Sequence, residues 1–329
     1  MIELKNDQLI VRFPDVHEDA VCRVEFQRTL RIPDDNREYP LPPGLGRFAL
    51  NHVDDYADKV PAVWRDHGGV FLPMNQAEAM WINFHGDYPM AVKVAAGKID
   101  ALTGESWKNE LSKNSQDYLV LPDQPWLDGF CVHKGLVRQF VAMPLGDGYT
   151  AEEQLTGEAQ HGGVQLVVYP MKAKVYEERY KRQRIFIEDA CYCLEAPSAD
   201  MEMGLAPGGL MRQEIYDDDY GFDAWDQSTR SRCFVHILNS LQFFGVTGSE
   251  PPSEPPTARQ YTDAGLPWFD YYAADQKALE GAKKLAGLDS VAAKKLKKGA
   301  GLLKDNDPVS PGFVKKLGEG KPVVREGDF

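Results

Sequence analysis

Residues 117–170 constrain the fold more than any other part of the chain, because they contain several short segments typical of β-strands separated by turns. Segments 130–132 and 136–143 flank Gly135, which can supply the positive φ of a three-residue hairpin turn. Segment 164–168 is a run of branched residues, typical of a strand that is buried on both faces. The centre of the chain therefore predicts antiparallel β structure.

The flanking segments extend this prediction. Those before the centre alternate polar and apolar residues as strands do, and those after it become gradually more helical. We expect an α+β fold, with a mostly antiparallel two-layer β body, one amphipathic helix over residues 223–244 and a helical C-terminal arm. The apolar residues that predict the helix recur at steps of three and four: Phe234, Ile237, Leu238, Leu241 and Phe244.

A proline-rich segment, PPSEPP at residues 251–256, is the predicted spacer between the β-rich body (1–250) and the arm (257–329). The arm is rich in Ala, Lys and Gly, with short helices expected at 275–286 and 290–298. So few large apolar residues cannot build a good core. The arm is therefore expected to be helical or extended and to lie against other protein surface.

Charge and composition exclude several classes of function. The net charge is −13, and the arm carries +3, so the first 256 residues carry −16. An acidic body repels nucleic acid and anionic lipid, and we expect neither as a partner. Five cysteines are few and odd in number, which favours free thiols in a reducing compartment. The N-terminus lacks the apolar run of a signal peptide, and no apolar segment reaches membrane-spanning length, so we expect a soluble cytoplasmic protein.

Four long runs carry a resemblance to known sequences: HGGVFLPMNQAEAMWINF, QDYLVLPDQPWLDGF, RQFVAMPLGDGYTAEEQLTGE and GLPWFDYY. Through them the chain resembles, over most of its length, a widespread family of uncharacterised bacterial proteins. The resemblance implies a fold shared by that family. It implies no activity and no site residues.

Residues 146–151, GDGYTA, match the form of a dinucleotide-binding fingerprint, in which bare glycines let backbone N–H groups approach a pyrophosphate. Asp147, Glu152 and Glu153 would place three carboxylates beside that pyrophosphate. We therefore interpret the segment as a surface turn on which Thr150 and Glu153 form a capping box.

Acidic residues crowd one short segment and offer the hard oxygen ligands that Ca²⁺ prefers: Asp217, Asp218, Asp219, Asp223 and Asp226. Their spacing does not fit an EF-hand loop. Solvated acids at the start of the expected helix explain Asp223 and Asp226 without a metal. Calcium is thus the one candidate cofactor, on a weak signal.

Two Cys–His pairs are spaced so that each pair would share a face, Cys131 with His133 on a strand and Cys233 with His236 on a helix. Either pair can be read as a nucleophile and its base. Catalytic pairs of this kind usually come from distant parts of a chain, so we expect both pairs to be structural.

Two functional hypotheses remain open. The preferred one is a non-catalytic binding or assembly protein, a homo-oligomer whose arm docks on its own body or on a neighbouring subunit. Its interface candidates are the large apolar residues of the arm: Trp268, Phe269, Tyr271, Leu285 and Leu296. The alternative is a small-molecule-binding protein or enzyme with a cleft at one end of the β body, in which Ca²⁺ could assist binding or catalysis. Its ligand or metal candidates are His85, Asp87, His133, Asp217, Asp219, Asp223 and Asp226.

Overall fold

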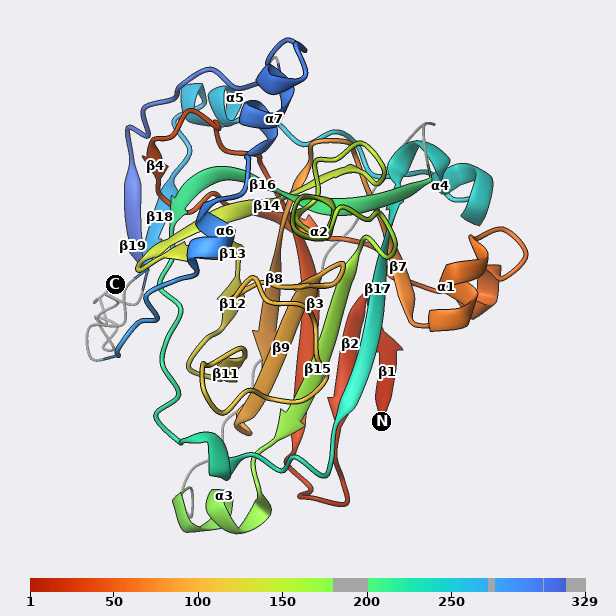
Figure 1. The fold of residues 1–329 in the computed structure, drawn as a ribbon, viewed down its shortest axis with the longest axis vertical. Coiled ribbons are helices and arrows are strands. Elements are labelled where there is room, and N and C mark those ends of the chain that lie inside the picture. The colour runs from red at the N-terminus through yellow and green to blue at the C-terminus, as the bar shows by residue number, and fades with distance from the viewer. Residues whose placement is uncertain (180–200, 272–275, 304, 318–329) are drawn as a thin grey trace, which may run out of the picture.

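The fold is known from a computed structural model, which describes residues 1–179, 201–271, 276–303 and 305–317 (Figure 1). Within these ranges the chain is rich in β-strands, most of them in one connected antiparallel network. The strands of that network are β1 (Ile2–Lys5), β2 (Gln8–Arg12), β3 (Val21–Thr29), β4 (Glu38–Tyr39), β5 (Gly44–Arg47), β6 (Asn51–His52), β7 (Val70–Met74), β8 (Ala79–His85), β9 (Met90–Ala96), β10 (Ile99–Asp100), β11 (Leu119–Leu121), β12 (Trp126–Leu127), β13 (Gly129–His133), β14 (Leu136–Pro144), β15 (Val164–Pro170), β16 (Glu202–Arg212) and β17 (Ser231–Asn239).

The pairings divide this network into two runs. The first is β1–β2–β3–β8–β14, with β5, β12 and β13 along it, and the second is β6–β7–β17–β15–β9, with β10 and β11 on β9. Strand β16 joins the runs, because it pairs with β14 along most of its length and with the end of β17. Only β17–β7 and β16–β4 pair in parallel within the described network.

One hydrophobic core serves both runs. Phe26 of β3 and Ile82 of β8 lie in the same buried cluster as Val94 of β9, Leu166 of β15 and Val235 of β17, each 2% exposed or less. Side chains alternate between the faces of a strand, so each of these strands directs every second residue into this core. The α+β expectation is therefore confirmed at the level of a β-rich, mainly antiparallel fold with few helices.

The helices are short. They are η1 (Asp54–Tyr56), α1 (Ala62–His67), α2 (Ala151–Thr156), α3 (Ala173–Arg179), η2 (Phe222–Ala224), α4 (Ser240–Thr247), α5 (Ala258–Asp263), α6 (Lys283–Ala286) and α7 (Val291–Lys297). No helix in the described ranges combines the length and the apolar character that a membrane span requires.

Several local predictions are confirmed. β13 and β14 form a hairpin across Gly135, whose φ is +72°. All seven residues of β15 are buried, as its branched residues indicated. Thr150 and Glu153 form the capping box of α2, with hydrogen bonds in both directions. Helix α7 corresponds to the helix expected at 290–298, whereas the one expected at 275–286 is reduced to α6 in the described residues.

The helix expected at 223–244 is wrong. That segment contains strand β17, and a helix begins only at Ser240, where the Asn239 side chain accepts a hydrogen bond from the N–H of Leu241. β17 is a central strand between β15 and β7, and much of it is buried. Apolar residues on both faces of a strand can imitate the three- and four-residue spacing of a helix, and here tertiary pairing decides between the two.

The arm lies against the body of the same chain (Figure 1), and its further strands β18 (Trp268–Tyr271) and β19 (Val314–Leu317) form a separate parallel pair. Trp268 is fully buried, with its ring 6.4 Å from that of Tyr39. The Asn306 side chain accepts from the backbone N–H of Asp34 at 2.8 Å and donates to its carbonyl at 3.1 Å. The N–H of Ala292, at the start of α7, donates to the Asp34 carboxylate at 2.8 Å.

Two leucines of the arm provide a matched test of this packing. Leu285 is 0% exposed and Leu296 is 62% exposed. We expect Leu285→Ala to lower the free energy of unfolding by about 2–5 kcal/mol, because it removes buried methyl groups and leaves a cavity. Leu296→Ala should change it by no more than about 0.5 kcal/mol. Urea unfolding followed by circular dichroism measures both, and equal effects would contradict the packing described.

Candidate functional site

Strand β17 carries a row of side chains on the face opposite the core. Arg232, Phe234 and His236 alternate along it, so they point to the same side. Helix α1 covers part of this row: the ring of Trp64 stacks on His236 with centroids 4.6 Å apart, and the ring of His67 stacks on Phe234 at 4.3 Å. The result is a continuous set of flat side chains that ends at the Arg232 guanidinium, 4.4 Å from the Phe234 ring centroid.

Two glycines allow the neighbouring segments to approach this strand. A Cβ at Gly69 would lie 2.2 Å from the Phe234 carbonyl oxygen, and one at Gly163 would lie 2.6 Å from the Val235 carbonyl oxygen. Both have positive φ, +87° and +57°. Each follows a histidine by two residues, and the rings of His67 and His161 meet at 5.0 Å. The close backbone approach thus brings two distant histidines together.

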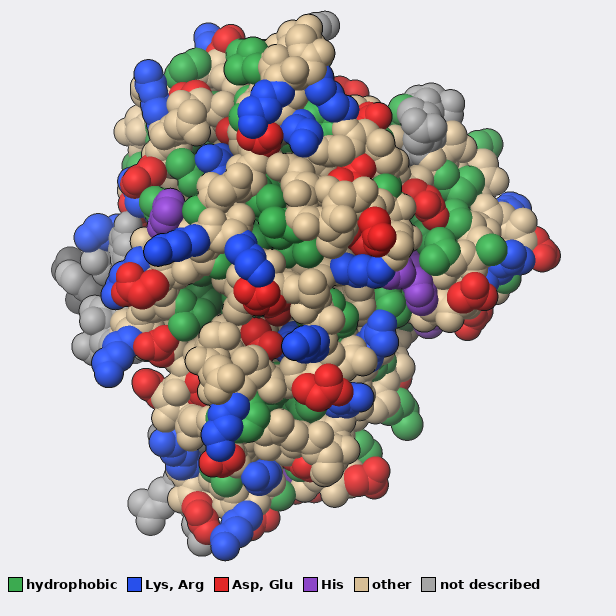
Figure 2. Space-filling view, in the orientation of Figure 1, with side chains coloured by type: hydrophobic (Ala, Val, Ile, Leu, Met, Phe, Trp, Pro, Cys, Tyr) green, Lys and Arg blue, Asp and Glu red, His purple; other side chains and the backbone are tan. Residues whose placement is uncertain are grey.

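A cavity of about 230 Å³ opens beside these histidines. Its lining comes from α1, the β9–β10 turn, the loop after β10, α2, the α2–β15 loop, β15 and β17: His67, Lys98, Ser106, Trp107, Thr156, His161, Gln165, Arg232 and Phe234. Figure 2 shows histidine and basic side chains close together on this face of the molecule, next to α1. The cavity therefore combines cationic, polar and aromatic surface.

The two permanent cations of the cavity form no ion pair with an acid within 4 Å in the described ranges. Arg232 donates to the Gln165 side chain at 3.2 Å, and Lys98 donates to the side chain of Gln160. Gln165 is itself fixed, since its amide donates to the Gly97 carbonyl at 2.6 Å. The charges of Arg232 and Lys98 are thus held next to neutral partners. Such cations can still attract an anion from solution.

The histidines of the site are neutral at neutral pH. Burial and the nearby Arg232 charge lower the pKa of His67, which Asp66 partly offsets. Burial, followed by the charges of Lys98, His67 and Arg232, lowers the pKa of His161. Burial also lowers the pKa of His236 to about 4, and its Nε2 lies 3.0 Å from the Gly68 carbonyl. At pH 7 the imidazoles therefore add hydrogen-bonding atoms without adding charge.

One acid lies beneath the site. Glu152 is 1% exposed, and its Oε2 accepts from the backbone N–H groups of His161 at 3.3 Å and Gly162 at 3.0 Å. Burial raises its pKa, although the Lys98 charge acts in the opposite direction. This carboxyl thus holds the backbone at His161 in place.

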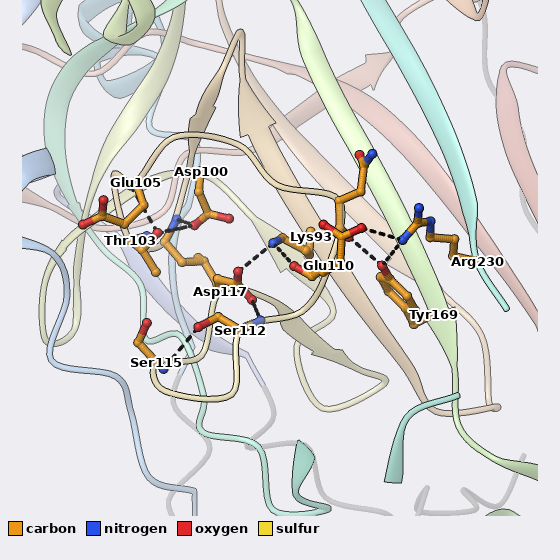
Figure 3. A network of polar contacts seen from close by, with 12 residues as sticks. Lys93, Asp100, Thr103, Glu105, Glu110, Ser112, Ser115, Asp117, Tyr169 and Arg230 are labelled. Carbon is orange, nitrogen blue, oxygen red and sulfur yellow. Dashed lines mark hydrogen bonds and ion pairs between the residues drawn. The ribbon is translucent and has the colours of Figure 1, made fainter. Parts of the chain in front are cut away.

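The loop between β10 and β11 forms one wall of the cavity and is held by a buried lysine (Figure 3). The Lys93 ammonium, 1% exposed, donates to the Asp117 carboxylate at 2.6 Å and to the Glu110 carbonyl at 2.7 Å. It also lies 5.2 Å from the ring centroid of Trp107. A buried charge is tolerated when it is paired and hydrogen-bonded in this way. Lys93 therefore positions the loop that presents Trp107.

A second set of contacts holds the same loop from β15 and from Arg230, the residue before β17. The Tyr169 hydroxyl donates to the Asn109 carbonyl at 2.6 Å, and Arg230 donates to the Glu110 carboxylate at 3.1 Å (Figure 3). Arg230 also donates to the Tyr169 hydroxyl at 3.3 Å. The wall is thus fixed to the strands on which the rest of the cavity is built.

The candidates predicted from sequence lie elsewhere. The side chain of His85 is 51% exposed and lies 3.6 Å from Glu25, Asp87 is exposed, and His133 is the exposed last residue of β13. None of them lines the cavity. Cys131 is 2% exposed, and the strand register shifts between it and His133.

Carboxylates of the acidic segment accept hydrogen bonds from side chains and backbone groups of the same chain. Asp218 accepts hydrogen bonds from the Tyr118 hydroxyl at 2.7 Å and the Trp225 indole at 2.9 Å, and from two backbone N–H groups. Asp226 accepts from Ser228, and the Asp217 N–H and Asp223 carbonyl bond to other parts of the chain. Asp219 forms no hydrogen bond with these aspartates in the described ranges. Across the described ranges, no three His, Cys, Asp or Glu side chains are grouped as metal ligands.

The prediction that Cys233 and His236 share one face of a helix is also wrong. Residues three apart on a strand point to opposite sides, and both belong to β17. Burial raises the pKa of the Cys233 thiol to about 12, so it stays protonated at neutral pH. The pair does not form a nucleophile and its base.

No protein-family model, curated protein or solved structure matches this chain. The geometry of the cavity is therefore the main guide to the function of this chain.

The sequence contains one signal for this cavity, a repeated tetrapeptide. The tetrapeptide His-Gly-Gly-Val occurs at residues 67–70 and again at 161–164, each time at the start of a strand. Those strands, β7 and β15, are the two neighbours of β17. A repeated histidine before two glycines thus marked the site, whereas Lys98, Trp107 and Arg232 had no distinguishing local pattern.

Asp100 makes the stability of this region depend on pH. Its Oδ1 accepts from the N–H groups of Leu102 and Thr103, whereas its Oδ2 is buried without a hydrogen-bond partner among the described residues. Burial, with the Asp117 charge second, raises its pKa from 3.8 to about 7. The folded state binds more protons than the unfolded state between these values, so this contribution to stability is lost as pH rises from about 4 to 7.

Asp100→Asn should remove that loss, because an amide keeps the accepting oxygen and does not ionise. The free energy of unfolding of the variant relative to wild type should rise by on the order of 3 kcal/mol between pH 5 and pH 8. Denaturant unfolding at both pH values measures this. The exposed Asp263→Asn is the control and should stay within about 0.5 kcal/mol of wild type. If the free energy of unfolding of Asp100→Asn differed from that of wild type by the same amount at both pH values, the raised pKa of Asp100 would be contradicted.

Proposed function

We propose that this protein binds a small organic anion in the cavity between α1, β17 and the loop after β10. The observation that carries the proposal is the presence of two permanent cations, Arg232 and Lys98, without an acid partner within 4 Å in the described ranges, beside the aromatic surface of Trp107 and Phe234. Small-molecule sites combine apolar or aromatic surface with polar groups that fix the orientation of the ligand, and this cavity offers both.

The size of the cavity supports a ligand with about one ring. An apolar cavity of about 150 Å³ accommodates benzene. At about 230 Å³, this one has additional room for a charged substituent. Because Gln165 and the loop are already held by hydrogen bonds, little ordering of the protein is needed on binding.

The histidines allow this proposal to be tested site by site. Small aromatic and aliphatic carboxylates, sulfonates and phosphates are titrated against the protein while its imidazole proton signals are followed by NMR. We expect ligand-dependent shifts in the signals of His67 and His161, and no shift in those of the distant exposed residues His85 and His133. Arg232→Gln should weaken binding by about tenfold or more, because a charge-assisted hydrogen bond is lost.

Arg12→Gln is the matched control for this variant, since Arg12 is another partly exposed arginine on a strand, 3.6 Å from Glu3. Its affinities should equal those of wild type. Shifts at His85 and His133 as large as those at His67, or equal losses in the two arginine variants, would exclude this site.

A second proposal concerns the arm. We infer that the two runs of strands form two layers, and that the arm, held on its own body, offers a surface to a second copy of the chain. Five of the eight exposed large apolar side chains in the described residues belong to it: Leu266, Leu296, Leu302, Phe313 and Val314. Of the predicted interface residues, Trp268 and Leu285 are buried within the chain, Phe269 and Tyr271 pack partly on its core, and Leu296 is exposed.

Sedimentation velocity over a range of concentrations tests this assembly. The full chain should sediment as an oligomer, and Leu302→Asp combined with Phe313→Asp should sediment as a monomer, because charged groups at a buried interface are costly. Leu155→Asp, at an exposed leucine of the body, is the control and should leave the oligomer intact. A full chain that remains monomeric throughout would refute the proposal.

A further inference from the structure

We infer that the anion is a phosphate monoester, with its phosphoryl group between Arg232 and Lys98 and its organic part against Trp107. This inference rests on the proposed function and specifies the ligand of the same cavity. It depends on the number and position of the charges, on the donors that remain available and on the apolar lining.

The charge of the cavity matches a dianion. Lys98 comes from the β9–β10 turn and Arg232 from β17, so the two cations reach the cavity from different elements. His67 and His161 are neutral at pH 7, so Arg232 and Lys98 give the lining a formal charge of +2. Asp66 and Glu152 are the acids whose charges act nearby, and neither forms an ion pair with Arg232 or Lys98 within 4 Å.

A phosphate monoester carries a charge of about −1.5 to −2 at pH 7. It would therefore neutralise both cations. A carboxylate carries a single negative charge and would leave one cation without a counter-charge. The number of cations thus favours the phosphate over the carboxylate.

The donors of the cavity suit a group with three acceptor oxygens. A guanidinium has five N–H groups and an ammonium three. The contacts with Gln165 and Gln160 use one donor direction of Arg232 and of Lys98. An arginine can bind two phosphate oxygens at once, and a lysine acts as a point charge beside them. Each neutral imidazole of His67 and His161 has one further N–H.

The remaining lining selects against a bare phosphate ion. Trp107 and Phe234 supply aromatic surface, and Trp107 belongs to the loop that Lys93 and Tyr169 hold in place. Inorganic phosphate would leave this surface exposed to water. A ring attached to the phosphoryl group would cover it and add the favourable burial of apolar area.

Calorimetric titration at pH 7.5 and low ionic strength tests the inference with four probes: phenyl phosphate, methyl phenyl phosphate, benzoate and inorganic phosphate. Methyl phenyl phosphate has the same ring and a single charge, so it is the matched control for the second charge. We expect phenyl phosphate to bind about tenfold or more tightly than each of the other three, because each lacks a charge, the phosphoryl group or the ring.

Variants then assign the contacts. Arg232→Gln and Lys98→Gln should each lower the affinity for phenyl phosphate by about tenfold. Trp107→Ala should lower the affinity for phenyl phosphate to about that for inorganic phosphate. Lys134→Gln, at an exposed lysine paired with Glu280, and Arg12→Gln should leave the affinity unchanged. Circular dichroism confirms that each variant is folded.

The results separate the inference from the proposed function. Benzoate or methyl phenyl phosphate binding as tightly as phenyl phosphate would overturn the phosphate monoester and leave an anion site at His67 and His161. Inorganic phosphate binding as tightly as phenyl phosphate would also overturn it, since the organic part would then contribute nothing. Absence of binding by every probe, with no shift in the His67 and His161 signals, would refute both.

Discussion

The close packing of backbone against strand β17 is the constraint on which the rest of the site depends. Gly69 and Gly163 let the segments before β7 and β15 approach its carbonyl groups, where any side chain would collide. One face of β17 then contributes Val235 and Ile237 to the core, and the other carries Arg232, Phe234 and His236. Core and cavity are therefore built on the same strand, and a change in its register would disturb both.

The buried Lys93 illustrates how the fold holds an irregular segment. A loop without regular structure has backbone groups that need partners, and here an ammonium and a tyrosine hydroxyl supply partners for Glu110 and Asn109. Such a pair adds little net stability when compared with apolar packing, but loss of one partner leaves an uncompensated buried charge. Any other position of the loop that carries Trp107 would leave the Lys93 charge buried without its partners. This cost in free energy restricts the loop to one position.

Some side chains of the arm are buried against the body, and others are exposed to solvent. Its buried members, Trp268 and Leu285, and its hydrogen bonds through Asn306 tie it to the body, whereas Leu302 and Phe313 remain in solvent. Its basic residues on α7 lie next to a body that carries most of the negative charge of the chain. Lys298, for example, donates to the Asp147 carbonyl near α2. The side chains that attach the arm to the body are therefore different from the apolar side chains that it exposes to solvent.

The sequence by itself determined the features that depend on neighbours along the chain. Gly135 indicated its hairpin, Thr150 and Glu153 their capping box, and the branched residues of 164–168 a buried strand, because turn geometry, helix capping and strand preference are local properties. Only the tertiary structure decided that residues 231–239 are a strand, since burial of both faces comes from its partners β15 and β7. It alone decided the cavity as well: His67, Lys98, Trp107, His161 and Arg232 come from five separate segments, and strand pairing between distant residues brings them together.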